Sequence, residues 1–240
     1  MQRNDNHSGR YAASSRPVQC AIGLLLWVVV AIPSLHAAQL QSTPAREALD
    51  ATVLVMGDSL SAGYGMPAAQ GWVALLDERL EKQDPGWEVV NASISGETTA
   101  GGRARIVGAL ARHRPRVVVV ALGANDGLRG LPTAQAAANL AYMIGAAHGA
   151  GAKVLLVGMQ MPPNYGPAYT RRFSAVFREL AESEDLPLVP FLMDGFADRP
   201  ELFLADGIHP TAEAQALILD TVWAKLQPML THADARAQRR

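Results

Sequence analysis

Cysteine is almost absent from this 240-residue sequence: its one copy, Cys20, lies near the start of an apolar stretch at 18–35. If that stretch is removed as a signal, the remaining chain contains no cysteine. Disulfides, thiolate catalysis and cysteine-ligated metals are then excluded. A lipid anchor on Cys20 is not indicated either, because the cysteine precedes most of the apolar run instead of ending it.

Charge is also scarce and balanced, with 21 basic and 22 acidic residues and a formal net charge of −1. Bulk electrostatics therefore give no reason to expect nucleic acid or an anionic surface as a partner. Residues of the apolar type make up 49% of the sequence, which indicates a globular chain and not a disordered one. The sequence shows no internal repeat at a fixed period, which gives no indication of a solenoid or a propeller.

The first forty residues differ from the rest. Arg3, Arg10 and Arg16 precede the apolar run, and small residues follow it at 37–38. This order predicts a signal peptide over 1–38 and a periplasmic or secreted protein. The alternative is an uncleaved membrane anchor, because the run approaches the length of a short spanning helix. We expect 39–50 to be a linker and 231–240 to be a flexible tail.

Between 51 and 230, apolar runs of strand length alternate with segments of helical periodicity. The predicted strands are 52–56, 87–92, 116–122, 153–157 and 188–191. The predicted helices are 71–83, 99–113, 132–150, 170–184 and 211–230, with a long loop at 159–169. Five alternations with short connections predict one domain, a three-layer α/β/α sandwich around a parallel sheet.

Right-handed crossovers bring the carboxyl ends of all these strands to one edge of the sheet. Ser59, Gly96 and Asn125 each follow a strand, so we expect them to face a common crevice, where such sheets bind their ligands. Asp206 and His209 stand three residues apart before the last helix, close enough for the carboxylate to orient the imidazole. Ser59 needs such a base, because an alcohol is a poor nucleophile at neutral pH.

The sequence thus predicts Ser59 as nucleophile, Asp206 as orienting acid and His209 as base. Candidate donors to an oxyanion are the backbone amide of Ser59, Gly96 and the side-chain amide of Asn125. Each motif alone is a common helix cap or turn. Their occurrence together, in order and at strand ends, is what favours a hydrolase.

The segments 57–60, 91–96, 123–126 and 206–209 resemble the four sequence blocks of the GDSL, or SGNH, hydrolases. Within that family the span 52–230 is similar to the bacterial periplasmic enzymes that act as thioesterases, arylesterases and lysophospholipases. The resemblance implies a flavodoxin-like five-stranded sheet, no metal or organic cofactor, and the residue roles given above. Ala124 departs from the pattern, because the family more often has a second glycine there; we expect this to be tolerated.

For the substrate we expect a small acyl ester, thioester or lysophospholipid. An apolar loop would line the acyl site with Met159, Met161, Pro162 and Tyr165. Two alternatives stay open: a carbohydrate deacetylase of the same family, and a non-catalytic binding protein on the same fold. We expect a monomer, with no nucleic acid and no stable membrane partner unless the N-terminal segment stays uncleaved.

Overall fold

The computed structural model describes residues 51–230. The signal peptide or anchor predicted over 1–38, the linker at 39–50 and the tail at 231–240 lie outside the described residues. Within 51–230 no helix is long and apolar enough to span a membrane.

The predicted parallel sheet is confirmed. Five strands pair in the order β2-β1-β3-β4-β5, and every pairing is parallel. They are β1 (Ala51–Gly57), β2 (Trp87–Asn91), β3 (Val117–Ala121), β4 (Lys153–Val157) and β5 (Leu188–Val189). All five residues of β3 are buried, as expected for a central strand covered on both faces.

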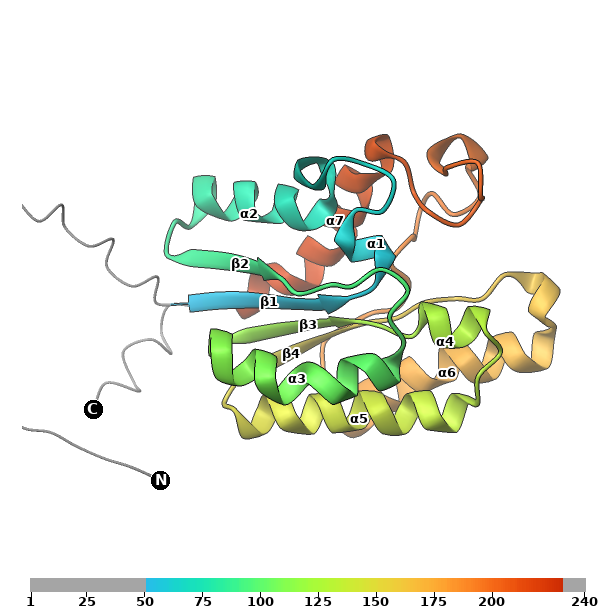
Figure 1. Ribbon diagram of the computed structural model, residues 1–240, viewed down its shortest axis with the longest axis horizontal. Coiled ribbons are helices and arrows are strands. Elements are labelled where there is room, and N and C mark those ends of the chain that lie inside the picture. Colours follow the sequence, from blue (N-terminus) through green and yellow to red (C-terminus); the bar gives the residue numbers. More distant parts are fainter. Residues whose placement is uncertain (1–50, 231–240) are drawn as a thin grey trace, which may run out of the picture. The chain divides into compact units, whose positions relative to one another are not determined.

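Helices cover both faces of this sheet, which confirms the three-layer sandwich (Figure 1). One face carries α2 (Trp72–Gln83) and α7 (Gln215–Leu226), and the other carries α3 (Thr99–His113), α5 (Thr133–Gly149) and α6 (Pro167–Ser183). These helices bury their apolar stripes on the sheet, and the fully buried aromatic residues Trp72, Phe173, Phe177 and Phe196 lie in the two cores.

Two short helices were missed by the sequence analysis: α1 (Ser59–Ala62) and α4 (Ala124–Leu128). Both follow a strand directly and lie at the carboxyl edge of the sheet (Figure 1). The predicted loop at 159–169 is shorter than expected, because it contains the 3-10 turn η2 (Pro163–Tyr165) and α6 already begins at Pro167. The other 3-10 turns are η1 (Ala68–Gln70), η3 (Pro200–Leu202), η4 (Ala212–Ala214) and η5 (Gln227–Met229).

The strand order places a topological switch point between β1 and β3. The chain leaves β1 toward β2 on one side, and the later strands are added on the other side. Loops that follow the two strands at such a point diverge and leave a crevice between them, where open α/β sheets bind ligands. Ser59 follows β1 and Asn125 follows β3, so both lie beside this crevice.

Candidate active site

Ser59 is the first residue of α1, at a sharp turn from strand to helix. Asp58 caps this helix, because its Oδ1 accepts a hydrogen bond of 3.1 Å from the backbone N–H of Leu60. The turn also needs a glycine at position 57. A Cβ there would lie 2.6 Å from Oγ of Ser61, inside any allowed contact distance. The local sequence thus fixes where the Ser59 hydroxyl emerges from the sheet.

Asp206 and His209 belong to one tight loop before η4. Gly207, with φ of 66°, lets the loop turn back, and the Asp206 Oδ1 accepts hydrogen bonds from the backbone N–H groups of Ile208 and His209, at 2.9 and 3.0 Å. The other carboxylate oxygen, Oδ2, lies 2.7 Å from Nδ1 of His209. One carboxylate therefore holds both the backbone and the ring of this histidine.

Backbone hydrogen bonds hold the two sides of the same loop together. The N–H of Leu204 donates to the carbonyl of His209 at 2.7 Å, and the N–H of Thr211 donates to that of Leu202 at 2.8 Å. The buried side chain of Gln215 then ties the loop to helix α2, because its Nε2 donates to the Thr211 carbonyl and its Oε1 accepts from the N–H of Trp72. The loop is thereby anchored to the layer that also covers β1.

The structure brings the three predicted residues into one chain of hydrogen bonds. The Oγ of Ser59 lies 2.9 Å from Nε2 of His209, whose other ring nitrogen faces Asp206. Hydrogen bonds from the backbone N–H and the ring of His209 lower the pKa of Asp206 to about 2, so this carboxylate is ionised at any working pH. The ring of Tyr64 covers the imidazole, with ring centroids 4.3 Å apart.

Gly96 lies in a turn after β2. The N–H of Glu97 donates to the carbonyl of Ile94 at 3.1 Å, and Gly96 has a φ of 79°, a value that favours glycine at the third position of such a turn. Arg129 holds the turn from the other side of the crevice, because its guanidinium donates to the Gly96 carbonyl at 3.0 Å. No contact of Arg129 was predicted, because residues 33 positions apart meet only in the folded chain.

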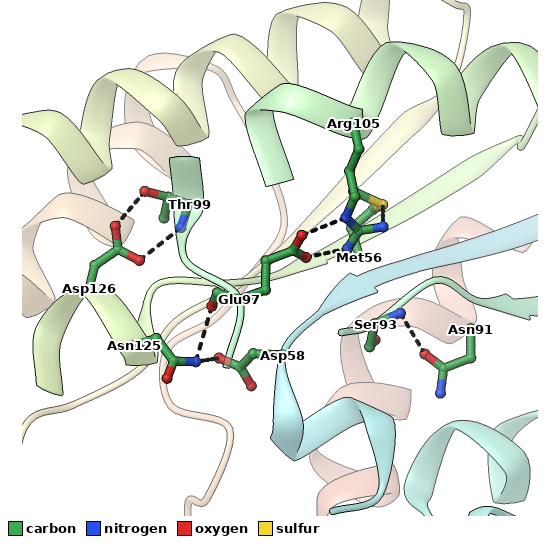
Figure 2. A network of polar contacts seen from close by, with 9 residues as sticks. All are labelled: Met56, Asp58, Asn91, Ser93, Glu97, Thr99, Arg105, Asn125 and Asp126. Carbon is green, nitrogen blue, oxygen red and sulfur yellow. Dashed lines mark hydrogen bonds and ion pairs between the residues drawn. The ribbon is translucent and has the colours of Figure 1, made fainter. Parts of the chain in front are cut away.

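Asn125 reaches from α4 toward the same crevice. Its Nδ2 donates to the backbone carbonyl of Glu97 at 3.0 Å and lies 3.4 Å from Oδ2 of Asp58, as Figure 2 shows. Burial raises the pKa of Asp58 to about 6, although hydrogen bonds from Leu60 and Asn125 and the nearby His209 act in the opposite direction. The sequence pattern indicated a helix cap here, which is confirmed, but it did not predict the contact of Asp58 with Asn125.

Further polar contacts fix the loops that carry these residues. The carboxylate of Asp126 accepts two hydrogen bonds from Thr99, one from the backbone N–H at 2.8 Å and one from the hydroxyl at 2.6 Å, which joins α4 to the start of α3. Glu97 forms a largely buried ion pair with Arg105 (Figure 2). The segment between β2 and α3 is thus held at both of its sides.

An apolar cavity of about 390 Å³ opens beside Leu60, the residue after Ser59. Of the four residues predicted to contact substrate, Met159, Met161 and Pro162 line it. Tyr165 is not among the lining residues; its hydroxyl instead donates to the Leu128 carbonyl at 3.0 Å. The opposite wall was missed because it comes from a later part of the chain, and it contains Phe191, Met193, Ala197, Phe203 and Ile208.

Ala124, where the sequence departs from the pattern, is the first residue of α4 and has no positive φ. Its conformation does not require glycine, and its side chain is buried at the cavity wall. In residues 51–230 no group of three or more His, Cys, Asp or Glu side chains is placed to hold a metal ion.

A parallel sheet of this order with a serine, histidine and aspartate at its carboxyl edge defines a class of α/β hydrolytic enzymes that use a serine. The chain belongs to the GDSL-like lipase/acylhydrolase family, whose sequence profile matches residues 55–217.

Among individual proteins, the chain is 50% identical to esterase TesA of Pseudomonas aeruginosa over 185 residues, which cover 77% of this chain and 92% of that protein. It is 43% identical to thioesterase 1/protease 1/lysophospholipase L1 of Escherichia coli over 187 residues, 78% of this chain and 88% of that protein. The crystal structure of TesA matches with a TM-score of 0.73 and 51% identity, covering 75% of this chain and 99% of that one.

Proposed function

We propose that the protein is a serine hydrolase of acyl esters, and also of thioesters and lysophospholipids, that works through an acyl-serine intermediate. The observation that carries this proposal is the continuous chain of hydrogen bonds from Ser59 through His209 to Asp206. Family membership supports it, and so do the two relatives, one named an esterase and the other a thioesterase and lysophospholipase.

In the first step His209 takes the proton of Ser59 at Nε2 while Oγ attacks the carbonyl carbon of the substrate. The carbonyl π electrons move to the oxygen, which becomes an oxyanion. When the tetrahedral intermediate collapses, the bond to the leaving group breaks, and His209 gives its proton to that group. A water molecule, deprotonated by the same histidine, then attacks the acyl carbon. The bond between this carbon and Ser59 Oγ breaks, His209 returns the proton to Oγ, and the acid is released. Asp206 stabilises the imidazolium and holds its tautomer throughout.

The oxyanion would be bound by the backbone N–H groups of Ser59 and Gly96 and by the side-chain amide of Asn125. The three residues follow three adjacent strands, β1, β2 and β3, at the same edge of the sheet, which supports a common target. Removing one such donor typically costs about a hundred- to a thousandfold in kcat.

The acyl chain would occupy the cavity beside Leu60. Its lining is almost entirely apolar, with aromatic, aliphatic and methionine side chains, and an acyl chain of medium or greater length would bury apolar surface there. This lining favours a fatty acyl ester over an acetyl ester, which is what a carbohydrate deacetylase would prefer. Replacing Met161 by Ala enlarges the cavity, so the preferred chain length in a series of nitrophenyl esters should increase. An unchanged preference would argue against this site.

The catalytic assignment is tested by Ser59→Ala, with Ser61→Ala as the matched control. Ser61 lies in the same short helix, and its hydroxyl has no hydrogen-bond partner among the described residues. We expect Ser59→Ala to abolish ester hydrolysis and covalent labelling by a fluorophosphonate, while Ser61→Ala keeps both. Wild-type protein that is folded but unlabelled and inactive would instead support a non-catalytic binding protein.

We also propose that residues 1–38 direct export and that the mature protein is a monomer. The proposal for export rests on the arginines, the apolar run and the small residues that follow it. Intact-mass measurement of protein recovered from the periplasm should give a chain that begins near Gln39. An uncleaved chain in the membrane fraction would favour the anchor, and light scattering of the purified protein tests the monomer.

A further inference from the structure

Asp58 is a buried carboxylate beside Ser59 for which the proposed reaction has no use. Its side chain is almost fully buried, with 1% of its surface exposed, and its two oxygens have different partners. Oδ1 accepts from the backbone N–H of Leu60, and Oδ2 faces Nδ2 of Asn125. A helix cap needs only the first of these contacts. The second one links Asp58 to a proposed oxyanion donor.

The amide of Asn125 has two N–H bonds and meets two acceptors. One is the Glu97 carbonyl at 3.0 Å, and the other is the Asp58 carboxylate at 3.4 Å (Figure 2). Neither a carbonyl nor an ionised carboxylate can donate, so together they require the nitrogen of the amide, and not its oxygen, to face these two acceptors. The distance of 3.0 Å is normal for a hydrogen bond, whereas 3.4 Å is longer than the usual range. The N–H toward Asp58 is therefore the loosely held one.

We propose that Asp58 is a positioning residue for hydrolysis: it holds the amide nitrogen of Asn125 in place in the resting enzyme and releases this N–H to the substrate oxygen when that oxygen becomes negative. The proposal rests on the oxyanion role of Asn125 described above. No bond to Glu97 has to break, so the amide stays in place while its second N–H changes acceptor. Only the long contact with Asp58 is given up when the oxyanion forms, so little reorganisation is needed, and donors held in this way stabilise developing charge well.

Two substitutions separate this role from that of the helix cap. In Asp58→Asn the side chain has one acceptor oxygen where the carboxylate has two, so it can satisfy Leu60 or Asn125 but not both. In Asp58→Ser the hydroxyl is a good helix cap, but it is too short to replace the contact with Asn125. Each variant keeps an oxygen that can accept from the N–H of Leu60 and cap the helix. If one variant fails to fold, the other still tests the role of the contact with Asn125.

The experiment is a double-mutant cycle at pH 8, with a nitrophenyl ester as substrate. Asn125→Ala should lower kcat by about a hundredfold or more, and each Asp58 variant should lower it by about thirtyfold, with KM changed by less than about threefold. In the Asn125→Ala background the same Asp58 substitutions should change kcat by less than about threefold, because the residue through which Asp58 acts is already gone. Asp77→Asn makes the same change at a residue of α2 whose Oδ1 accepts from the backbone N–H of Val89; it serves as the control and should leave kcat unchanged in both backgrounds.

The outcomes distinguish this proposal from the proposed function. If Asn125→Ala lowers kcat and the Asp58 losses simply multiply with it, Asp58 does not act through Asn125 and the inference is wrong. If Asn125→Ala keeps full kcat, the oxyanion role of Asn125 fails and the inference fails with it. The triad, which Ser59→Ala tests separately, is not affected by that result. Thermal unfolding of every variant shows whether a loss in kcat reflects a loss of folded protein.

Discussion

The proposed site contains two carboxylates, Asp206 beside His209 and Asp58 beside Ser59, and their surroundings change their pKa values in opposite directions. Asp206 is exposed and accepts hydrogen bonds from His209 and Ile208, which lower its pKa to about 2. Asp58 is buried, and the loss of hydration raises its pKa to about 6. The first carboxylate is always available to orient the base. The second one carries its charge only above weakly acidic pH, and the folded protein has to accommodate a buried charge there.

This difference makes a prediction for stability. A carboxyl group with a raised pKa binds its proton more tightly in the folded than in the unfolded chain, so Asp58 stabilises the fold most below the ordinary value of 3.8. That contribution is lost as the pH rises through about 6. It amounts to about 2 kcal/mol between pH 4 and pH 8.

Asp58→Ser should remove this dependence. Relative to wild type, the variant should be less stable at pH 4 than at pH 8, as measured by the free energy of unfolding in urea at both values. A difference from wild type that stays constant across this range would show that Asp58 is ionised in the folded protein even at pH 4.

Tyr64 provides a second prediction for a single residue. Its ring lies on the imidazole of His209, and an aromatic face attracts the positive charge that the histidine acquires in the transition state. Tyr64→Leu should therefore lower kcat by about two- to fivefold, the equivalent of a cation–π contact at an exposed site. Tyr64→Phe keeps the ring and should retain the wild-type kcat in the same assay. Equal losses in both variants would point to the hydroxyl instead of the ring.

Among the elements, the long ones were predictable and the two short ones were not. Helices α2 and α3 and strand β4 begin or end within a residue of their predicted limits, because apolar periodicity and flanking proline or glycine define them. Helix α1 has four residues and α4 has five, which is too short to show a period. Their sequences, rich in Ser, Asp, Asn and Gly, also look like turns.

Proline explains two further differences in element limits. Helix α6 starts at Pro167, three residues before the predicted start, because proline is well suited to the first helical position. Strand β5 ends at Val189 instead of 191, because Pro190 has no N–H to donate to the sheet.

The proposed site, too, could be predicted only in part from the sequence. Strand ends predicted that Ser59, Gly96 and Asn125 lie at one edge, and the spacing of Asp206 and His209 predicted their contact. The contact of Asp58 with Asn125 and the position of Tyr165 depend on side-chain packing that no periodicity reports.

The junction of β1 and α1 gives a prediction at the scale of elements. Gly57→Ala should cost about 1–3 kcal/mol, because its Cβ would overlap Ser61 and push α1 away from the sheet. A lower kcat should accompany this loss, since α1 carries Ser59. Gly108→Ala is the control: this glycine is in α3 with open space around it, so alanine should stabilise the helix by about 0.5–1 kcal/mol. Both values can be measured by urea unfolding.

For the whole molecule, the chemistry lies at one edge of the sheet and the packing that stabilises it extends through both layers of helices (Figure 1). Stability and activity should therefore be separable. Leu80 is fully buried in the last turns of α2 and is not one of the residues of the proposed site, so Leu80→Ala should lower the free energy of unfolding by about 2–5 kcal/mol. The kcat measured well below the unfolding temperature should remain that of the wild type. A matching loss in kcat would mean that the site responds to packing at a distance.

The hydrogen bond between Ser59 and His209 joins residues 150 positions apart. A chain that is still being synthesised has its serine and the first strand long before the loop that supplies the base. Until residues up to 209 are present and folded, the serine remains an ordinary alcohol. The order of the residues along the chain thus delays the appearance of ester hydrolysis until the domain is nearly complete.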